Sequence, residues 1–83
     1  MKKHLKINDY FYTSDLALVA ALVSWNFPIE SIDKTDPKKA LFAFKKTTQL
    51  EDHVQSYWND TKFVSPKRYF SVIKEVKTRI YQE

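Results

Sequence analysis

The chain has 83 residues, enough for one domain with a thin hydrophobic core. It contains no cysteine and no glycine, which excludes a disulfide framework, a thiolate metal site, a cysteine nucleophile and a glycine-rich phosphate loop. The formal net charge of +4 permits binding to nucleic acid or to an acidic partner without establishing either.

We interpret residues 1–83 as a single domain and expect it to be cytoplasmic. Small secreted domains usually depend on disulfides, and this sequence offers none. The N-terminus does not read as a secretion signal, and the longest apolar run, residues 16–23, is too short to span a membrane. We therefore expect no membrane partner.

The N-terminal part predicts a strand followed by a buried helix. Residues 1–9 are mostly polar and charged and are expected to form a frayed basic lead-in. Residues 10–13 are aromatic and predict a strand. Ser14 and Asp15 offer side-chain oxygens to the unpaired N–H groups of a helix start. The helix predicted over residues 15–25 carries no charge after Asp15, so it is buried on most sides or partly covered by a partner.

The middle and end of the chain predict a hairpin and two amphipathic helices. Residues 29–34 and 40–46 predict strands joined by a turn at Pro37, most simply an antiparallel hairpin. A helix capped by Thr48 follows, and the last helix starts at Ser65 and Pro66. Residues 62–64 are either a short edge strand or a loop, in which case the sheet has three strands.

The resulting order, β-α-β-β-α-(β)-α, predicts the α+β class. We expect a small antiparallel sheet with helices, in the ferredoxin-like split β-α-β order, extended by one C-terminal helix.

Several segments together resemble a known family: Tyr-Phe-Tyr-Thr-Ser-Asp-Leu-Ala-Leu at 10–18, Phe-Pro-Ile-Glu-Ser-Ile-Asp at 27–33, Asp-Pro-Lys-Lys at 36–39, Phe-Ala-Phe at 42–44 and Tyr-Trp at 57–58. The family consists of small prokaryotic and phage-associated domains of unknown function. The resemblance covers nearly the whole chain, and its most specific part is the Tyr-Thr-Ser-Asp-Leu start of the first helix. It implies a stand-alone module encoded on a phage or other mobile element, and it implies no activity.

The second hairpin strand carries the strongest signal for nucleic-acid binding. Phe42 and Phe44 point to the same side of this strand, because strand side chains alternate. Single-strand RNA modules of this topology stack bases on two such rings while lysines contact the phosphates. The alternative is that both rings face the helices as core, which the small size of the domain favours. The candidate residues around this strand are Lys39, Phe42, Phe44, Lys45 and Lys46, with Tyr10 and Tyr12 extending the platform from the first strand.

Basic residues also follow the last predicted helix. Lys67, Arg68 and Lys74 are candidate phosphate contacts. The alternative is an ordinary solvated helix face, on which Glu75 relieves the positive charge.

The two tryptophans, Trp25 and Trp58, are candidate partner-binding residues. Each is placed near the end of a predicted helix, and tryptophan is over-represented among interface hot spots. The alternative is that both belong to the core.

No catalytic or metal-binding set can be assembled from the sequence. His4 and His53 lack partners at metal-ligand spacing, and no nucleophile and base, nor any pair of carboxylates, suggest catalysis. We therefore expect no enzyme activity, no cofactor and no metal.

Two functions remain open at this point. The first is a non-catalytic accessory protein that binds RNA or single-stranded nucleic acid through lysine and arginine contacts to phosphate and through aromatic stacking. The alternative is a protein-binding adaptor or homo-oligomeric module that uses the apolar first helix and the tryptophans.

Overall fold

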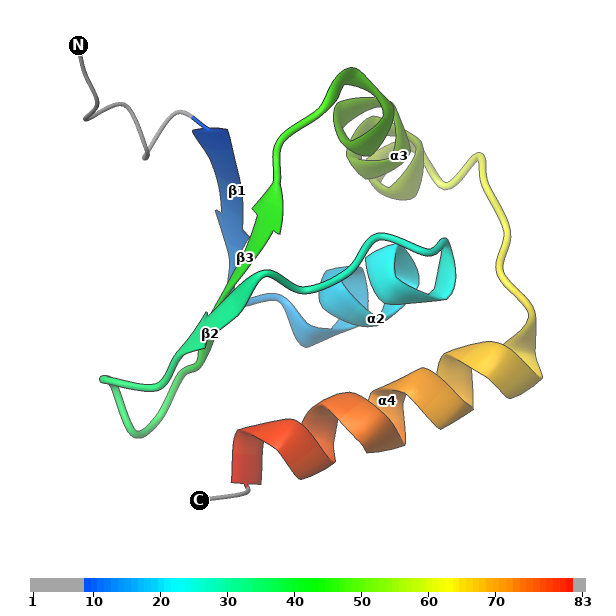
Figure 1. Cartoon of the computed structure of the whole chain (residues 1–83). Coiled ribbons are helices and arrows are strands. Elements are labelled where there is room, and N and C mark those ends of the chain that lie inside the picture. The colour runs from blue at the N-terminus through cyan, green and yellow to red at the C-terminus, as the bar shows by residue number, and fades with distance from the viewer. Residues whose placement is uncertain (1–8, 82–83) are drawn as a thin grey trace, which may run out of the picture.

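The computed structural model describes residues 9–81 and shows an α+β fold (Figure 1). Its elements are β1 (Tyr10–Thr13), α2 (Leu16–Ser24), β2 (Ser31–Asp33), β3 (Leu41–Lys45), α3 (Thr48–Asn59) and α4 (Pro66–Tyr81). The predicted fold class is confirmed. Residues 62–64 form no strand, so the sheet of the described residues has three strands.

The predicted frayed lead-in, residues 1–9, lies outside the described residues except for Asp9. The carbonyl oxygen of Asp9 accepts a hydrogen bond from the Lys46 N–H at 3.0 Å. Asp9 therefore extends the pairing between β1 and β3 by one step.

The sheet has the strand order β1-β3-β2, and β3 is antiparallel to both neighbours. Helix α2 connects β1 to β2, and β3 is inserted between them, which makes a split β-α-β unit. Figure 1 shows α2, α3 and α4 on one side of the sheet. The opposite face of the sheet is therefore not covered by any of these helices.

The strand register decides which side chains enter the core. Phe11 is paired with Phe44, and Thr13 with Phe42, so these residues share the face that packs on the helices. Phe42 and Phe44 retain 1% and 0% of their accessible surface. The predicted base-stacking role for these two rings is wrong, because the helices enclose them; the alternative, that both belong to the core, is correct.

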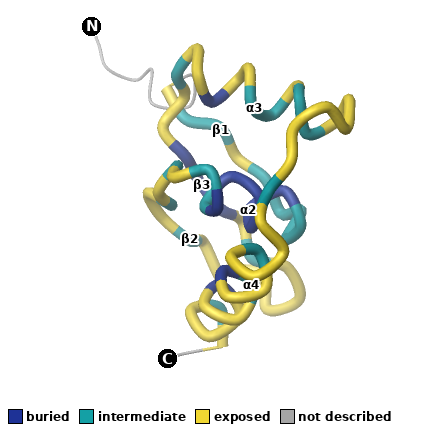
Figure 2. The backbone as a smooth tube through the Cα atoms, turned by 90° about the vertical axis from the view of Figure 1, so that its right-hand side faces the viewer, coloured by how far each residue is buried: buried dark blue, intermediate teal, exposed yellow. Residues whose placement is uncertain are grey.

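Helix α2 is the centre of the core. It contacts both α3 and α4, and Figure 2 shows the buried residues concentrated in α2 and β3. Leu18, Val19 and Leu22 are fully enclosed there, which explains why the helix carries no charged side chain.

The helix ends are determined by local hydrogen bonds. Asp15 caps α2 as predicted, since its Oδ1 accepts from the N–H groups of Ala17 at 3.0 Å and Leu18 at 3.3 Å. After α2, Asn26 adopts the left-handed conformation with φ 74°. The cap of α3 is Thr47 and not Thr48, because the hydroxyl of Thr47 accepts from the Leu50 N–H.

The turn between β2 and β3 contains an acid–hydroxyl pair whose effect on pH dependence is testable. The hydroxyl and the backbone N–H of Thr35 both donate to the Asp33 carboxylate and hold the pKa of Asp33 below its ordinary value. Because the folded state has the lower pKa, this contribution to stability is complete above the unfolded-state pKa. It is lost as the pH falls through the folded-state pKa.

We expect Thr35→Val to raise the pKa of Asp33 towards its ordinary value, since the valine removes the hydroxyl donor. NMR titration of the side-chain carboxyl carbon measures this pKa. Thr78→Val is the control, because the Thr78 hydroxyl donates to the carbonyl of Lys74 within α4. An unchanged pKa in Thr35→Val would contradict the assignment.

Candidate functional site

An open groove lies where the C-terminal ends of α2 and α3 meet the N-terminal end of α4. It has a volume of about 630 Å³, and residues 60–65, which link α3 to α4, form part of its wall. Its lining is mostly aromatic and includes Trp25, Tyr57, Trp58, Phe63, Tyr69 and Phe70.

Three of the groove's rings are strongly exposed. Trp58, Phe63 and Phe70 retain 60%, 86% and 66% of their accessible surface. A domain this small needs its large apolar side chains inside, so three exposed rings around one groove depart from what folding alone requires. Contiguous exposed apolar surface of this kind marks interaction sites in proteins.

Trp25 holds the wall of the groove in place. It is half-buried at the end of α2, and its indole Nε1–H donates to the carbonyl oxygen of Phe63 at 3.0 Å. The ring packs beside His53, with centroids 5.4 Å apart, and the Lys62 ammonium lies 6.0 Å from its centroid. Trp25 therefore joins α2 to the link between α3 and α4, and Trp58 is the more accessible of the two tryptophans.

Tyr57 and Trp58 form an edge-to-face aromatic pair at the end of α3. Their ring centroids are 5.0 Å apart, with an interplanar angle of 79°. Burial raises the pKa of the Tyr57 phenol, and the negative charges of Asp15 and of ionised Tyr69 raise it further. The phenol therefore stays neutral at physiological pH and keeps its O–H as a hydrogen-bond donor.

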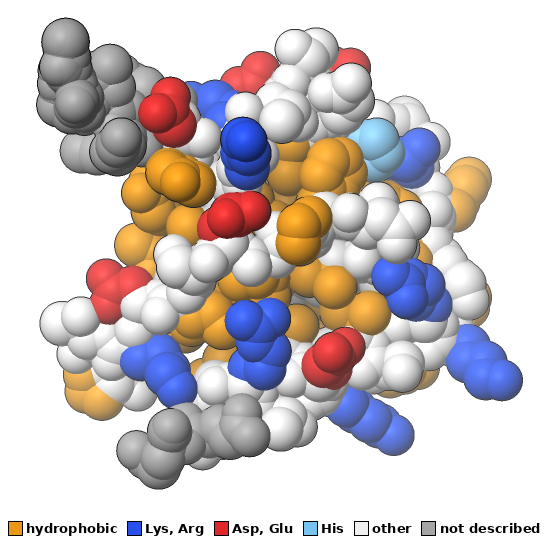
Figure 3. All heavy atoms as spheres, in the orientation of Figure 1, with side chains coloured by type: hydrophobic (Ala, Val, Ile, Leu, Met, Phe, Trp, Pro, Cys, Tyr) orange, Lys and Arg blue, Asp and Glu red, His pale blue; other side chains and the backbone are white. Residues whose placement is uncertain are grey.

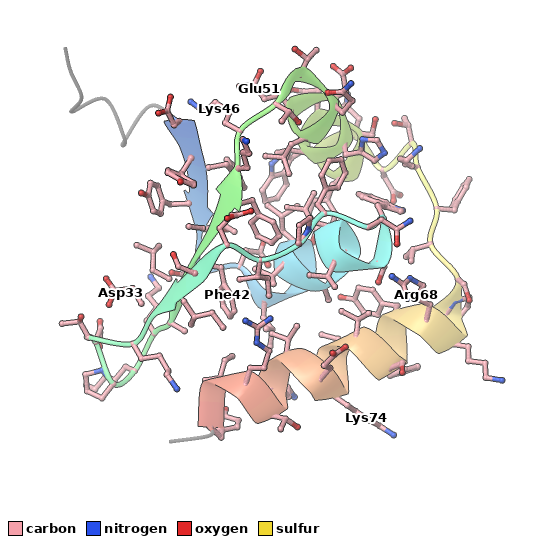
Figure 4. The ribbon with its side chains drawn as sticks, in the orientation of Figure 1. Asp33, Phe42, Lys46, Glu51, Arg68 and Lys74 are labelled. Atoms are coloured by element: carbon pink, nitrogen blue, oxygen red, sulfur yellow. The ribbon has the colours of Figure 1, made fainter. Side chains whose placement is uncertain are left out.

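The guanidinium group of Arg68 forms hydrogen bonds to other residues of the domain. Its Nε donates to the Ser24 carbonyl at 2.8 Å, and its Nη2 donates to the Val23 carbonyl at 3.2 Å and to Asn26 Oδ1 at 3.1 Å. Figure 4 shows this side chain reaching from α4 towards α2. The cation interacts favourably with carbonyl oxygens at the C-terminal end of α2, where the helix dipole is negative, so the structure gives Arg68 a role different from the predicted phosphate contact.

The other basic candidates lie in separate places. Lys67 and Lys74 are exposed on α4, and Figure 4 shows Lys74 pointing away from the other elements. Lys45 and Lys46 lie at one end of β3, and Lys39 precedes its other end. Figure 3 shows Lys and Arg side chains scattered among Asp and Glu over the face in view, with no single basic patch there.

Tyr10 and Tyr12 lie on the open face of the sheet. They alternate with the inward-facing Phe11, and their ring centroids are 6.3 Å apart. Lys45 is paired with Tyr10 across the sheet. Of the predicted platform, this open face therefore keeps the two tyrosines and Lys45, while Phe42 and Phe44 lie inside.

Sequence reasoning missed Phe63 and Phe70 as groove residues. The sequence pattern places residues 62–64 in an optional edge strand and gives Phe70 no candidate role. The helical period gave a usable signal, because Phe70 is offset from the buried Val72 and Val76 around α4. No comparable signal marks Phe63, whose position depends on the path of the link after α3.

The fold and the groove together define a small α+β domain with exposed aromatic side chains at the meeting point of its three described helices. The chain belongs to the family described as "Domain of unknown function (DUF5659)", whose model matches residues 8–82. This match confirms the predicted resemblance to a family of unknown function. No curated protein and no solved structure matches the chain.

None of the helices within residues 9–81 has the length and apolar character needed to cross a membrane. Within the same residues, no three His, Cys, Asp or Glu side chains gather into a group able to hold a metal ion.

Proposed function

We propose that this protein is a non-catalytic adaptor that binds an apolar segment of a partner protein in the aromatic groove. The observation that carries the proposal is the exposure of Trp58, Phe63 and Phe70, between 60% and 86%, around one groove. Aromatic residues are enriched in protein interfaces, and a few of them usually carry most of the binding energy.

The arrangement of the groove supports a peptide segment as the ligand. Its wall is anchored by the hydrogen bond from Trp25 to the carbonyl of Phe63, so part of the site exists before binding. A preformed site loses less conformational entropy when a ligand binds. The groove also has a few polar lining residues, among them Asp60 and Lys62, which can orient a bound peptide.

Selection from a library of random displayed peptides tests this function. We expect peptides that bind the natural protein and bind Trp58→Ala/Phe63→Ala at least about 30-fold more weakly, because hot-spot rings contribute about 2 kcal/mol or more. Tyr12→Ala is the control, since Tyr12 is an exposed ring on the open face of the sheet. Circular dichroism checks that each variant keeps its fold.

The proposal fails if no peptide is enriched, or if Tyr12→Ala weakens binding as much as the groove variant does. Light scattering addresses self-association separately. A dimer of the natural protein that dissociates in the groove variant would identify a second copy of the chain as the ligand.

Nucleic-acid binding is a second candidate function, favoured by the open face of the sheet. Tyr10 and Tyr12 offer rings for base stacking, and Lys45 lies beside them for a phosphate contact. Fluorescence anisotropy with a labelled single-stranded RNA oligonucleotide measures the affinity of the protein for RNA. Tyr12→Ala and Lys45→Ala should each weaken this binding. Absence of binding at low salt would exclude it, because charge-driven affinity is greatest there.

The biological setting of either function is part of the same proposal. The absence of cysteine supports a reducing, cytoplasmic location. The sequence resemblance supports an accessory role encoded by a phage or other mobile element.

A further inference from the structure

We infer that the partner segment is acidic: its apolar side chains fill the groove, and its carboxylates lie over Lys67 and Lys74 on α4. This inference rests on the proposed function, because it names the chemistry of the segment that the groove binds.

Phe70 connects the groove to these two lysines. It lines the groove, and Lys67 and Lys74 lie three residues before it and four residues after it on α4. Residues at these spacings are neighbours on a helix surface, with Cβ atoms about 5–6 Å apart. All three side chains are exposed, so a segment that leaves the groove across Phe70 passes between two ammonium groups.

Within residues 9–81, no hydrogen bond or ion pair holds the ammonium group of Lys67 or of Lys74. Glu75, the acidic residue of α4, lies about 140° around the helix from Phe70, at about 100° per residue. The positive charge beside Phe70 is therefore not neutralised by its own helix, and it is complementary to carboxylates on a bound segment.

The charge around the groove is asymmetric, and this determines on which side of the groove the acidic part of the segment lies. Asp60 lies at the start of the link after α3 and lines the groove together with Lys62, so that side carries both signs of charge. The α4 side carries Lys67 and Lys74. The carboxylates of the segment should therefore lie on the α4 side of the groove, next to the apolar side chains that fill it.

An acidic peptide fits these features better than a nucleic acid does. A phosphate backbone gains little from an apolar groove that Asp60 lines, whereas a peptide supplies apolar anchors and carboxylates in one chain. Nucleic acid remains an outcome that the experiment separates.

The experiment uses the peptides enriched from the random library on the natural protein. We expect large apolar residues together with more Asp and Glu than the unselected library contains. One enriched peptide and its counterpart with Asp changed to Asn and Glu to Gln are then compared by fluorescence anisotropy. The neutral counterpart should bind about fivefold more weakly at low salt, since exposed ion pairs contribute modestly. This difference should shrink at high salt.

Charge reversal locates the effect. Lys67→Glu/Lys74→Glu should weaken the binding of the acidic peptide by about fivefold or more. It should change the affinity for the neutral peptide by no more than about twofold. Lys38→Glu/Lys46→Glu is the matched control, because it makes the same change in net charge at two exposed positions outside α4 and should leave the binding of both peptides unaffected.

The outcomes separate the two proposals. Enriched peptides that bind the groove without an excess of acidic residues overturn the inference and leave the proposed function standing. The inference also falls if both charge-reversal variants act equally, or if a single-stranded oligonucleotide binds at Lys67 and Lys74 more tightly than the acidic peptide. A library that yields no groove-dependent peptide overturns both proposals.

Discussion

Phe44→Ala should lower the free energy of unfolding by about 3–5 kcal/mol, because it removes an enclosed ring and leaves a cavity in a thin core. Phe44 retains 0% of its accessible surface and belongs to the cluster that includes Leu18, Leu22 and Leu50. Such a loss is comparable with the total stability of many small domains. Urea denaturation followed by circular dichroism measures it.

Phe70→Ala is the matched control for this experiment. It removes the same ring from a side chain that retains 66% of its accessible surface, and it should change the stability by no more than about 0.5 kcal/mol. Equal losses for the two variants would contradict the assignment of Phe44 to the core and of Phe70 to the exposed groove.

Arg68→Ala should lower the free energy of unfolding by about 1–2 kcal/mol, less than the sum of its separate bonds because the side chain is exposed and screened by water. The substitution removes donors to the carbonyl oxygens of Val23 and Ser24 and to Asn26 Oδ1. Arg68→Lys should not restore the loss, because a single ammonium does not reproduce the geometry of the guanidinium group.

Lys67→Ala provides the comparison, since Lys67 is the exposed basic neighbour of Arg68 and should contribute close to nothing to stability. Thermal unfolding of the three variants beside the natural protein measures the differences. If Arg68→Ala has the stability of Lys67→Ala but weakens oligonucleotide binding, then Arg68 acts as the phosphate contact predicted from the sequence.

The elements of the fold were largely predictable because their signals are local. The carboxylate of Asp15, the left-handed stop at Asn26 and the proline at the start of α4 each act within one turn of a helix. The alternation of strand side chains also placed Phe42 and Phe44 correctly on one side of β3. Which side faces the helices depends on the packing of three helices on one face of the sheet, and the residues of the strand do not encode that choice by themselves.

The site was predictable only in part, for a related reason. Both tryptophans were identified as candidate partner contacts, and both line the groove. The groove as a whole brings together Trp25, Trp58, Phe63 and Phe70, which are far apart in the chain. Its wall also includes the irregular link between α3 and α4, whose path no periodicity in the sequence describes. The role of Arg68 was missed because its acceptors lie more than forty positions away in the sequence.

The location of both indoles at the groove gives the natural protein a built-in optical reporter. The chain has two tryptophans, and both line this one site. Trp58 is largely in water, so a ligand that covers it should shift the emission to shorter wavelength, whereas a molecule on the opposite side of the sheet should leave the spectrum unchanged. Occupancy of the groove can thus be followed without attaching a dye.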